Sequence, residues 1–443
     1  MIASTSPASD LAVAPAYRPA GGMRILIVNS LFQPYENGGA ERAVRLLAEG
    51  LRESGFDASV ACLSPANTEV RDVVHGVPVF RLPLANLYWP FAGNAGPVSG
   101  AKRALWHLFD TYNPVMGARL GRLLDHLRPD VVHFNNLAGF SVAALVAARR
   151  RRIATVQTLH DYYYVCPRTT TFKGGHNCAQ ACGACRAYTA PRRRIGRGVD
   201  MVCGVSDAML RRLEAFGAFR GARRRAVVYG ANLHAAAAPA RRTDHRGGER
   251  LTVGYLGRLD ATKGIETLID AAALLRGQPV EVAIAGRGPA SYEAALQGRA
   301  EGLAVRFVGQ VEPSQFLSEI DVLVVPSVWH EPFGRVVQEA FACGVPVVGS
   351  EAGGIPEAIG KAGPGFLFPP GSSARLAEIL AGFVADGLPA SDLFDNGLLR
   401  SRDFSSDRVV QDHIGLYRQV FDGVAAERET VAEHLLQARS GPA

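Results

Sequence analysis

Apolar residues come in short runs that alternate with segments of helical period. The first run, Arg24 to Asn29, predicts a short buried strand, and the next helix starts near Ala40, where apolar positions recur three and four residues apart. Further strand-like runs in the first half lie at 58–63, 77–82, 131–134, 154–159, 201–205 and 226–229. This alternation is typical of parallel strands covered by helices.

The alternation stops at 235–250, a polar stretch with Pro and Gly that has the composition of a linker. It then resumes with strand-like runs at 251–256, 280–285, 305–308, 322–325 and 345–348, and with helical patterns from 265, near 335, at 373–385 and at 406–438. We therefore predict an α/β fold with two doubly wound, Rossmann-like domains facing a cleft. The expected parts are a disordered tail (1–22), a first domain (23–234), the linker, a second domain (251–402) and C-terminal helices (403–443) that could return to the first domain.

Composition agrees with two α/β domains, since 48% of the 443 residues are apolar and 48 are glycine. No apolar run reaches the roughly 18 residues of a membrane span. The tail has neither the basic start nor the apolar block of a signal peptide. Four of the seven cysteines are clustered, which favours a reducing compartment over a scattered disulfide framework. We expect a cytoplasmic protein.

Charge is divided unevenly between the two halves. Residues 1–240 hold 29 Lys and Arg against 15 Asp and Glu, or +14, whereas residues 241–443 hold 19 against 26, or −7. The basic residues of the first half could simply be solvated helix ends. They would suit equally well a domain that faces an anionic partner, such as a membrane surface or a phosphate-bearing acceptor. No nucleic-acid-binding pattern accompanies them, so nucleic acid is not an expected partner.

The richest segment for chemistry is 325–358. Glu331 follows a predicted buried strand, and Glu339 lies in the opening turns of the next helix, with Gly334 between them. Ligands of open parallel sheets bind at the carboxyl ends of the strands, and a helix start offers N–H groups to an anion. Two carboxylates near such a helix suit a ligand with both hydroxyls and a phosphate, as in a nucleotide sugar.

Two cations occupy the corresponding loop after the first strand of the second domain. Residues 257–264 read Gly-Arg-Leu-Asp-Ala-Thr-Lys-Gly. Arg258 and Lys263 would both point into the cleft, where a diphosphate needs positive charge. A chance pair of surface cations is the alternative, and the strand-to-helix context weighs against it.

Loops of the first domain supply the opposite wall. Gly38 and Gly39 would let backbone approach a phosphate or sugar, although the loop lacks the GxGxxG pattern of NAD-binding proteins. His160 ends another strand and would reach the cleft rim to hold a sugar hydroxyl and stabilise charge; a structural pair with Asp161 is the alternative.

Two glycine loops of the second domain complete the candidate site. Gly286 could line the base or phosphate pocket, though a plain turn explains it as well. Gly354 belongs to the Gly-Gly-Ile-Pro-Glu run after the last buried strand, where backbone N–H groups would suit phosphate or sugar oxygens.

Together these elements resemble the retaining glycosyltransferases of GT-B fold, the group 1 or mannosyltransferase-like family. The resemblance covers about residues 23–420 and is strongest over 251–358, where the Gly-Arg…Lys-Gly and Glu-Pro-Phe-Gly…Glu-Ala runs occur in the family's order. Two positions differ from the usual pattern: Arg287 replaces an acidic residue, and 229–233 read Tyr-Gly-Ala-Asn-Leu in place of the common interdomain signature.

The resemblance implies a role for each motif. Arg258 and Lys263 would bind the donor diphosphate and neutralise the leaving nucleoside diphosphate. Glu339 would bond the nucleotide ribose, and Glu331 would lie beside the transferred sugar with Gly334.

The family likeness also implies that Gly39 lies near the phosphates and that His160 is the active-site histidine. Transfer would proceed with retention, through an oxocarbenium-like route without a covalent intermediate and without a metal at the donor site. The acceptor would be a glycan or lipid-linked saccharide, in cell-surface polysaccharide assembly.

The clustered cysteines are Cys166, Cys178, Cys182 and Cys185. Four thiols within 20 residues can enclose a tetrahedral metal, and we predict a structural zinc that fixes an insertion at 162–190. An Fe–S cluster, disulfides or free thiols remain the alternatives.

Aromatic residues at 87–91, with Lys102, Arg103 and Trp106 nearby, suggest an interfacial patch beside the basic first domain. We predict peripheral association with the inner face of an anionic membrane, although core packing would suit these aromatics equally well. Two other functions remain open: a nucleotide-sugar 2-epimerase of the same fold, which the 331–339 run disfavours, and a zinc-bearing adaptor, which leaves the second-domain motifs unexplained.

Overall fold

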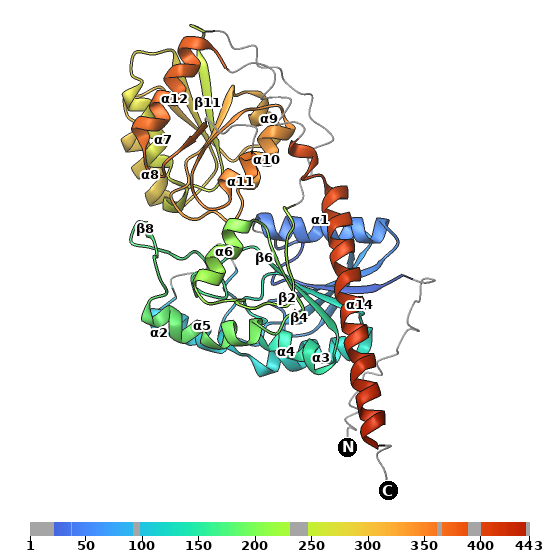
Figure 1. Cartoon of the computed structure of the whole chain (residues 1–443). Coiled ribbons are helices and arrows are strands. Elements are labelled where there is room, and N and C mark those ends of the chain that lie inside the picture. The colour runs from blue at the N-terminus through green and yellow to red at the C-terminus, as the bar shows by residue number, and fades with distance from the viewer. Residues whose placement is uncertain are drawn as a thin grey trace, which may run out of the picture.

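The computed structural model describes residues 22–36, 38–91, 98–230, 247–360, 366–388 and 400–439. Two α/β domains lie one above the other in Figure 1, and the last helix runs from the second domain down along the first. The segments expected to form the N-terminal tail and the linker fall almost entirely outside the described residues.

The first domain is built on an eight-stranded sheet of order β10-β9-β6-β5-β1-β2-β4-β3. All neighbours pair in parallel except β3, which is antiparallel to β4 at the edge. Its strands are β1 (Arg24–Val28), β2 (Asp57–Ser64), β3 (Val70–Val74), β4 (Val77–Pro83), β5 (Val131–Phe134), β6 (Ala154–Leu159), β9 (Met201–Gly204) and β10 (Arg225–Val227). A separate two-stranded hairpin joins β7 (Phe172–Lys173) and β8 (His176–Asn177).

Six helices belong to the described part of this domain before residue 230. They are α1 (Gly39–Glu53), α2 (Gly100–Thr111), α3 (Pro114–Leu127), α4 (Ala143–Arg150), α5 (Gly183–Gly196) and α6 (Asp207–Ala215). A fully buried ion pair joins two of them: Arg192 of α5 donates to Asp110 of α2 over 2.9 Å.

The second domain has a six-stranded parallel sheet of order β13-β12-β11-β14-β15-β16. Its strands are β11 (Leu251–Leu256), β12 (Val280–Ala285), β13 (Val305–Gly309), β14 (Val322–Val325), β15 (Val347–Ser350) and β16 (Leu367–Phe368). Helical elements around this sheet are η2 (Ala261–Lys263), α7 (Ile265–Leu274), α8 (Ala290–Arg299), α9 (Pro313–Ser318), α10 (Arg335–Ala342), α11 (Ile355–Ile359) and α12 (Ser373–Asp386).

The long helix α14 (Ser406–Arg439) returns to the first domain and lies along it in Figure 1. Its apolar residues Val410, Ile414 and Tyr417 share one core cluster with residues of β1, β2 and α1. A buried polar contact reinforces this packing, because His133 of β5 lies 2.7 Å from the Tyr417 hydroxyl.

The strand order confirms the predicted α/β fold, and the predicted strands match observed ones apart from their ends. The run expected at 345–348 begins as strand β15 only at Val347, after Pro346, because proline cannot donate to a sheet ladder. The hairpin of β7 and β8 was not predicted, because strands of two residues carry no readable period.

Candidate functional site

The clearest constellation at the sheet edge of the second domain is a bonded pair of opposite charges. Lys263, at the end of η2, donates to Glu331 Oε2 over 2.6 Å, and both side chains are largely buried. The indole N–H of Trp329 donates to the same oxygen over 2.8 Å, and the Lys263 ammonium lies 5.5 Å from the Trp329 ring. Two motifs that are 68 residues apart therefore meet at one carboxylate.

Local backbone packing explains why these loops meet. Gly264 has a φ of +65°, and a Cβ there would lie 2.2 Å from the carbonyl oxygen of Pro326. The Val328 N–H also donates to Thr262 O over 3.0 Å. Only glycine allows this approach, so the loops after β11 and β14 are held against each other and bring the Lys263 ammonium to the Glu331 carboxylate.

Arg258 leaves the same loop but extends into solvent. Its side chain is 75% exposed and lies 3.6 Å from Asp260. Its carbonyl oxygen accepts from the Tyr255 hydroxyl over 2.7 Å, which anchors the backbone. The guanidinium is thus exposed at the carboxyl edge of the sheet, whereas the Lys263 ammonium is largely buried against Glu331.

Arg335, the first residue of α10, joins the two domains at the glycine loop that was predicted to face the donor. Its guanidinium donates to the carbonyl oxygen of Gly39, and a Cβ on Gly39 would lie 2.9 Å from Arg335 Cδ. Burial lowers the pKa of Arg335, and the carboxylates of Glu339 and Glu41 oppose that shift. The predicted ribose ligand Glu339 therefore lies beside Arg335, one turn into the helix that begins after Gly334.

His160 lies at the end of β6 and is neutral. Burial lowers its pKa to about 3, with smaller contributions from the nearby His413 and Arg335. Its Nε2 is 2.8 Å from Asn135 Oδ1, whereas Asp161 accepts from the Tyr163 N–H. The alternative of a structural His–Asp pair is therefore wrong, and His160 can act near neutral pH as a hydrogen-bonding group.

The glycines of two other loops act mainly in packing. A Cβ on Gly286 would lie 1.8 Å from Gly257 O, and the Gly286 N–H donates to Gly309 O over 2.7 Å. The Gly354 N–H donates to Glu331 O over 2.7 Å, so this amide orients the Glu331 backbone and is not the free phosphate donor that we expected. Gly38, at the N-cap of α1, has an extended φ of −170° and no special strain.

The rest of the Gly-Gly-Ile-Pro-Glu run closes the domains on each other. The Glu357 carboxylate accepts from the N–H groups of Asp207 and Ala208, over 2.8 and 2.6 Å, at the start of α6. Ser206 donates to the carbonyl oxygen of Pro332 over 2.5 Å. The helix end of the first domain thus receives a carboxylate from the second domain, as expected for an anion at a helix N-terminus.

The cysteine cluster is only partly assembled. Burial raises the pKa of Cys185 to about 12, and the nearby thiols of Cys166 and Cys182 contribute to this shift. Cys178 is held separately through its backbone, which bonds to Thr171 and Arg212. Within the described ranges, no three His, Cys, Asp or Glu side chains are grouped so that they could hold a metal ion. The structure therefore does not form the expected four-thiolate site, and zinc binding stays a prediction.

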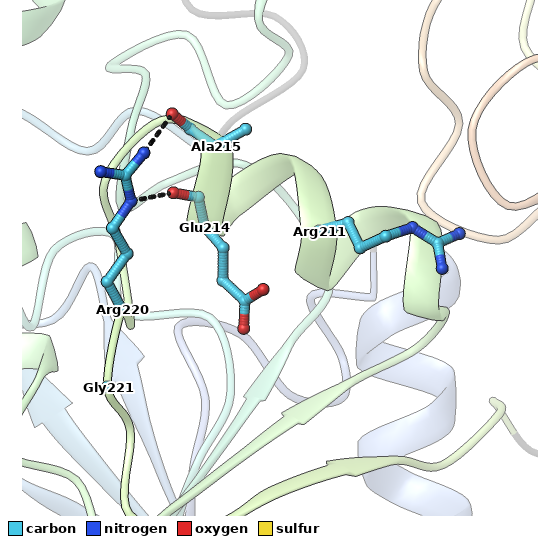
Figure 2. Close-up of a pocket in the computed structure, with 5 residues that line it drawn as sticks. All are labelled: Arg211, Glu214, Ala215, Arg220 and Gly221. Carbon is cyan, nitrogen blue, oxygen red and sulfur yellow. Dashed lines mark hydrogen bonds between the residues drawn. The ribbon is translucent and has the colours of Figure 1, made fainter.

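A hollow of about 520 Å³ on α6 and the loop after it is not part of this constellation. Figure 2 shows Arg220 bonded to the carbonyl oxygens of Glu214 and Ala215, while Arg211 points away from them. None of these residues takes part in the Lys263–Glu331 pair.

The sequence argument missed three residues that shape the site. Trp329 was overlooked because an aromatic after a strand normally signals core packing. Arg335 carried a readable signal, because a cation at a helix N-terminus is disfavoured by the helix dipole. Such a cation therefore indicates a compensating interaction elsewhere. Asn177, at the end of the β7–β8 hairpin, bonds the loop before Glu331 and had no local signal at all.

Known proteins resemble this chain along most of its length. Residues 38–231 match the family "Glycosyl transferase 4-like domain", and residues 240–397 match "Glycosyl transferases group 1". An uncharacterized 42.6 kDa protein in the cps region of Klebsiella pneumoniae is 30% identical over 337 residues, which cover 76% of this chain and 87% of that protein. The glycogen synthase of Mycobacterium tuberculosis is 29% identical over 82% of this chain and 86% of its own length.

Solved structures share the fold. Sucrose-phosphate synthase from Thermosynechococcus elongatus aligns with a TM-score of 0.69 at 23% identity, over 90% of this chain and all of that one. HepE of Anabaena, solved in complex with UDP, aligns with a TM-score of 0.65 at 21% identity over 90% of this chain and all of that one. Both are glycosyltransferases of GT-B fold. The chain therefore belongs to the group 1 glycosyltransferases and has the GT-B fold.

Proposed function

We propose that this glycosyltransferase moves a sugar from a nucleoside-diphosphate sugar to a hydroxyl of a saccharide or lipid-linked saccharide, with retention of configuration and without a metal at the donor site. The observation that carries the proposal is the Lys263–Glu331 pair at the carboxyl edge of a parallel sheet. The structures of HepE with UDP and with UDP-glucose support a donor of this class. The Klebsiella relative in the cps region supports a role in polysaccharide assembly.

In this proposal the donor diphosphate lies against Lys263, with the exposed Arg258 guanidinium closing over it. Both cations would stabilise the negative charge that develops on the leaving nucleoside diphosphate, which is the charge a metal would otherwise neutralise. Glu331 would bond hydroxyls of the transferred sugar, while Glu339 would bond the ribose. The neutral His160 would bond a sugar hydroxyl from the opposite wall without adding a competing positive charge.

Incubation of the protein with nucleotide sugars tests the reaction class. Release of nucleoside diphosphate with an acceptor-dependent, glycosylated product of unchanged anomeric configuration would support the proposal, and activity should survive EDTA. An epimerised donor without transfer would favour the 2-epimerase, and inversion at the anomeric carbon would contradict retention.

We also propose that the first domain rests on an anionic membrane, where a lipid-linked acceptor would be found. The aromatics first considered for this contact point inward: Trp106 is buried, and Trp89 and Phe91 pack against the core. Leu87 of the 87–91 segment is exposed, and the other exposed apolar side chains near Lys102 and Arg103 lie on α2 and the start of α3. They are Leu105, Leu108, Phe109, Tyr112 and Val115.

An exposed apolar helix face with adjacent cations is the composition of an interfacial helix. None of the described helices has the length and apolar character that a membrane span requires. In a flotation assay at low salt, the protein should rise with vesicles that contain anionic lipid. A Leu108→Ser/Phe109→Ser variant should stay in the vesicle-free bottom fraction. Equal recovery of both proteins would contradict the proposal, and neutral vesicles serve as the control for charge.

A further inference from the structure

We infer that the hairpin of β7 and β8, which lies just before Cys178, is a strap that positions the donor-site loop, and that Asn177 is the positioning residue through which it acts. The inference rests on the proposed function for its catalytic consequence, but its structural part does not. The loop concerned, residues 326–334, joins β14 to α10 and carries both Trp329 and Glu331.

Asn177 meets this loop with both ends of its side-chain amide. Its Nδ2 donates to Val328 O over 2.8 Å, and its Oδ1 accepts from the His330 N–H over 2.9 Å. The amide therefore pairs with a C=O and an N–H two residues apart, as a neighbouring strand would. These two backbone groups flank Trp329, whose indole N–H reaches the Glu331 carboxylate.

A second contact from the same domain reinforces the first. The buried Tyr162 donates its hydroxyl to His330 O over 2.9 Å, and its ring meets Trp329 edge-on at 6.2 Å between centroids. Both polar groups of the His330 backbone are thus bonded by the first domain, one by Asn177 and one by Tyr162. The first domain therefore satisfies backbone groups of this loop that the second domain leaves unpaired, and it adds to the bonds from Thr262 and Gly354.

Helix α6 in turn holds the strap through the side chain of Arg212. Arg212 donates to Thr171 Oγ1 over 3.1 Å and to Cys178 O over 2.8 Å, on both sides of the hairpin. Its guanidinium also lies 5.9 Å from the Tyr162 ring. In Figure 1 the hairpin projects beside α6 on the side of the first domain that faces the second. It is therefore a fixed support and not a loose insertion.

The contacts of Asn177 and Tyr162 join the two domains, so they exist only while the domains are closed on each other. The bonds that the loop makes to Thr262, Lys263 and Gly354 lie within the second domain and do not require closure. The strap would make the conformation of the Glu331 loop depend on closure, so that Glu331 takes its working position when the acceptor-side domain is engaged. Asn177 touches neither reacting group in this scheme and acts through the loop.

The test uses hydrogen exchange of the full chain, which needs no substrate. Asn177→Ala should speed exchange of peptides covering 326–334 by roughly ten-fold or more, since two hydrogen bonds are lost, while the peptide covering β11 stays unchanged. His176→Ala is the matched control, because that neighbouring side chain is exposed and bonds within the hairpin to Gly174 O. Tyr162→Phe keeps the buried ring and should speed exchange in the same peptides if Asn177→Ala does not fold.

Unchanged exchange in 326–334, or an equal increase in His176→Ala, would overturn the strap. The kinetic readout is separate: Asn177→Ala should lower kcat/KM for the nucleotide sugar roughly ten-fold while affinity for the nucleoside diphosphate alone stays near that of the wild type. Altered exchange with no transfer activity in the wild type would leave the strap standing and refute the proposed function. Faster exchange in Asn177→Ala with an unchanged kcat/KM would show that the strap holds the loop without affecting catalysis, and this result would refute the positioning role.

Discussion

Replacing Lys263 with alanine is the sharpest test of the donor site, because the side chain has one well-defined partner. Its ammonium lies 2.6 Å from Glu331 Oε2, and the two side chains are 18% and 14% exposed. At an effective dielectric constant of about 20, the gross attraction at this distance is about 6 kcal/mol. Desolvation of both charges cancels most of it, so a net contribution of about 1–3 kcal/mol to stability is expected.

The kinetic effect should be larger than the structural one. Loss of one preorganised positive group that faces developing negative charge typically costs about 10²–10³ in rate, or roughly 3–4 kcal/mol. We expect Lys263→Ala to lower kcat/KM for the nucleotide sugar by this factor while the fold persists. Lys263→Arg keeps the charge and should retain more activity.

The assay is the initial rate of nucleoside diphosphate release, with thermal unfolding measured on the same samples. A rate for Lys263→Ala within about three-fold of the wild type would refute the diphosphate role. Arg258→Ala offers a second comparison: its side chain is 75% exposed and should hardly affect stability, so any rate loss there must come from the donor complex.

Three further changes have defined outcomes. Asp110→Ala leaves a fully buried arginine without its carboxylate and should cost about 3–5 kcal/mol in the free energy of unfolding, measured by denaturant titration. Burial lowers the pKa of His413, so its neutral form stabilises the fold above the unfolded pKa near 6.5, and this contribution is lost as pH falls. His413→Gln should therefore reduce the loss of unfolding free energy between pH 7 and 5.5 by up to about 1.3 kcal/mol; an unchanged loss would show that this histidine does not titrate on unfolding. Gly39→Ala, whose Cβ would lie 2.9 Å from Arg335, should weaken donor binding in calorimetry far more than Gly38→Ala, whose Cβ would lie 3.3 Å from the movable end of a glutamate.

Sequence reasoning reached the fold because its signals are local. A buried parallel strand is a short apolar run, and the apolar positions of an amphipathic helix recur every three to four residues. Each element can therefore be recognised from about ten consecutive residues. The same logic located the loops of Lys263 and Glu331, since the carboxyl ends of parallel strands share one edge. It also placed His160 at a strand end, although the lowered pKa of its ring depends mainly on burial in the folded protein.

Tertiary structure alone decided which loop groups are free and which are used in packing. Gly286 and Gly354 look like ligand loops in the sequence, yet the amide of each is already bonded to a neighbouring loop. The apolar face of α2 likewise became visible only when Trp106 proved buried and Leu108 exposed.

The sequence by itself determined most strands of the two sheets, several of their helices and the edge at which chemistry can occur, because short-range periodicity and turn residues specify these. Contacts between the domains were decided only by tertiary structure: Arg335 on Gly39, Glu357 on α6 and Asn177 on the loop before Glu331. Each joins residues about 150 to 300 positions apart, and the free energy of such a contact depends on the relative placement of two completed domains. No local pattern encodes that placement.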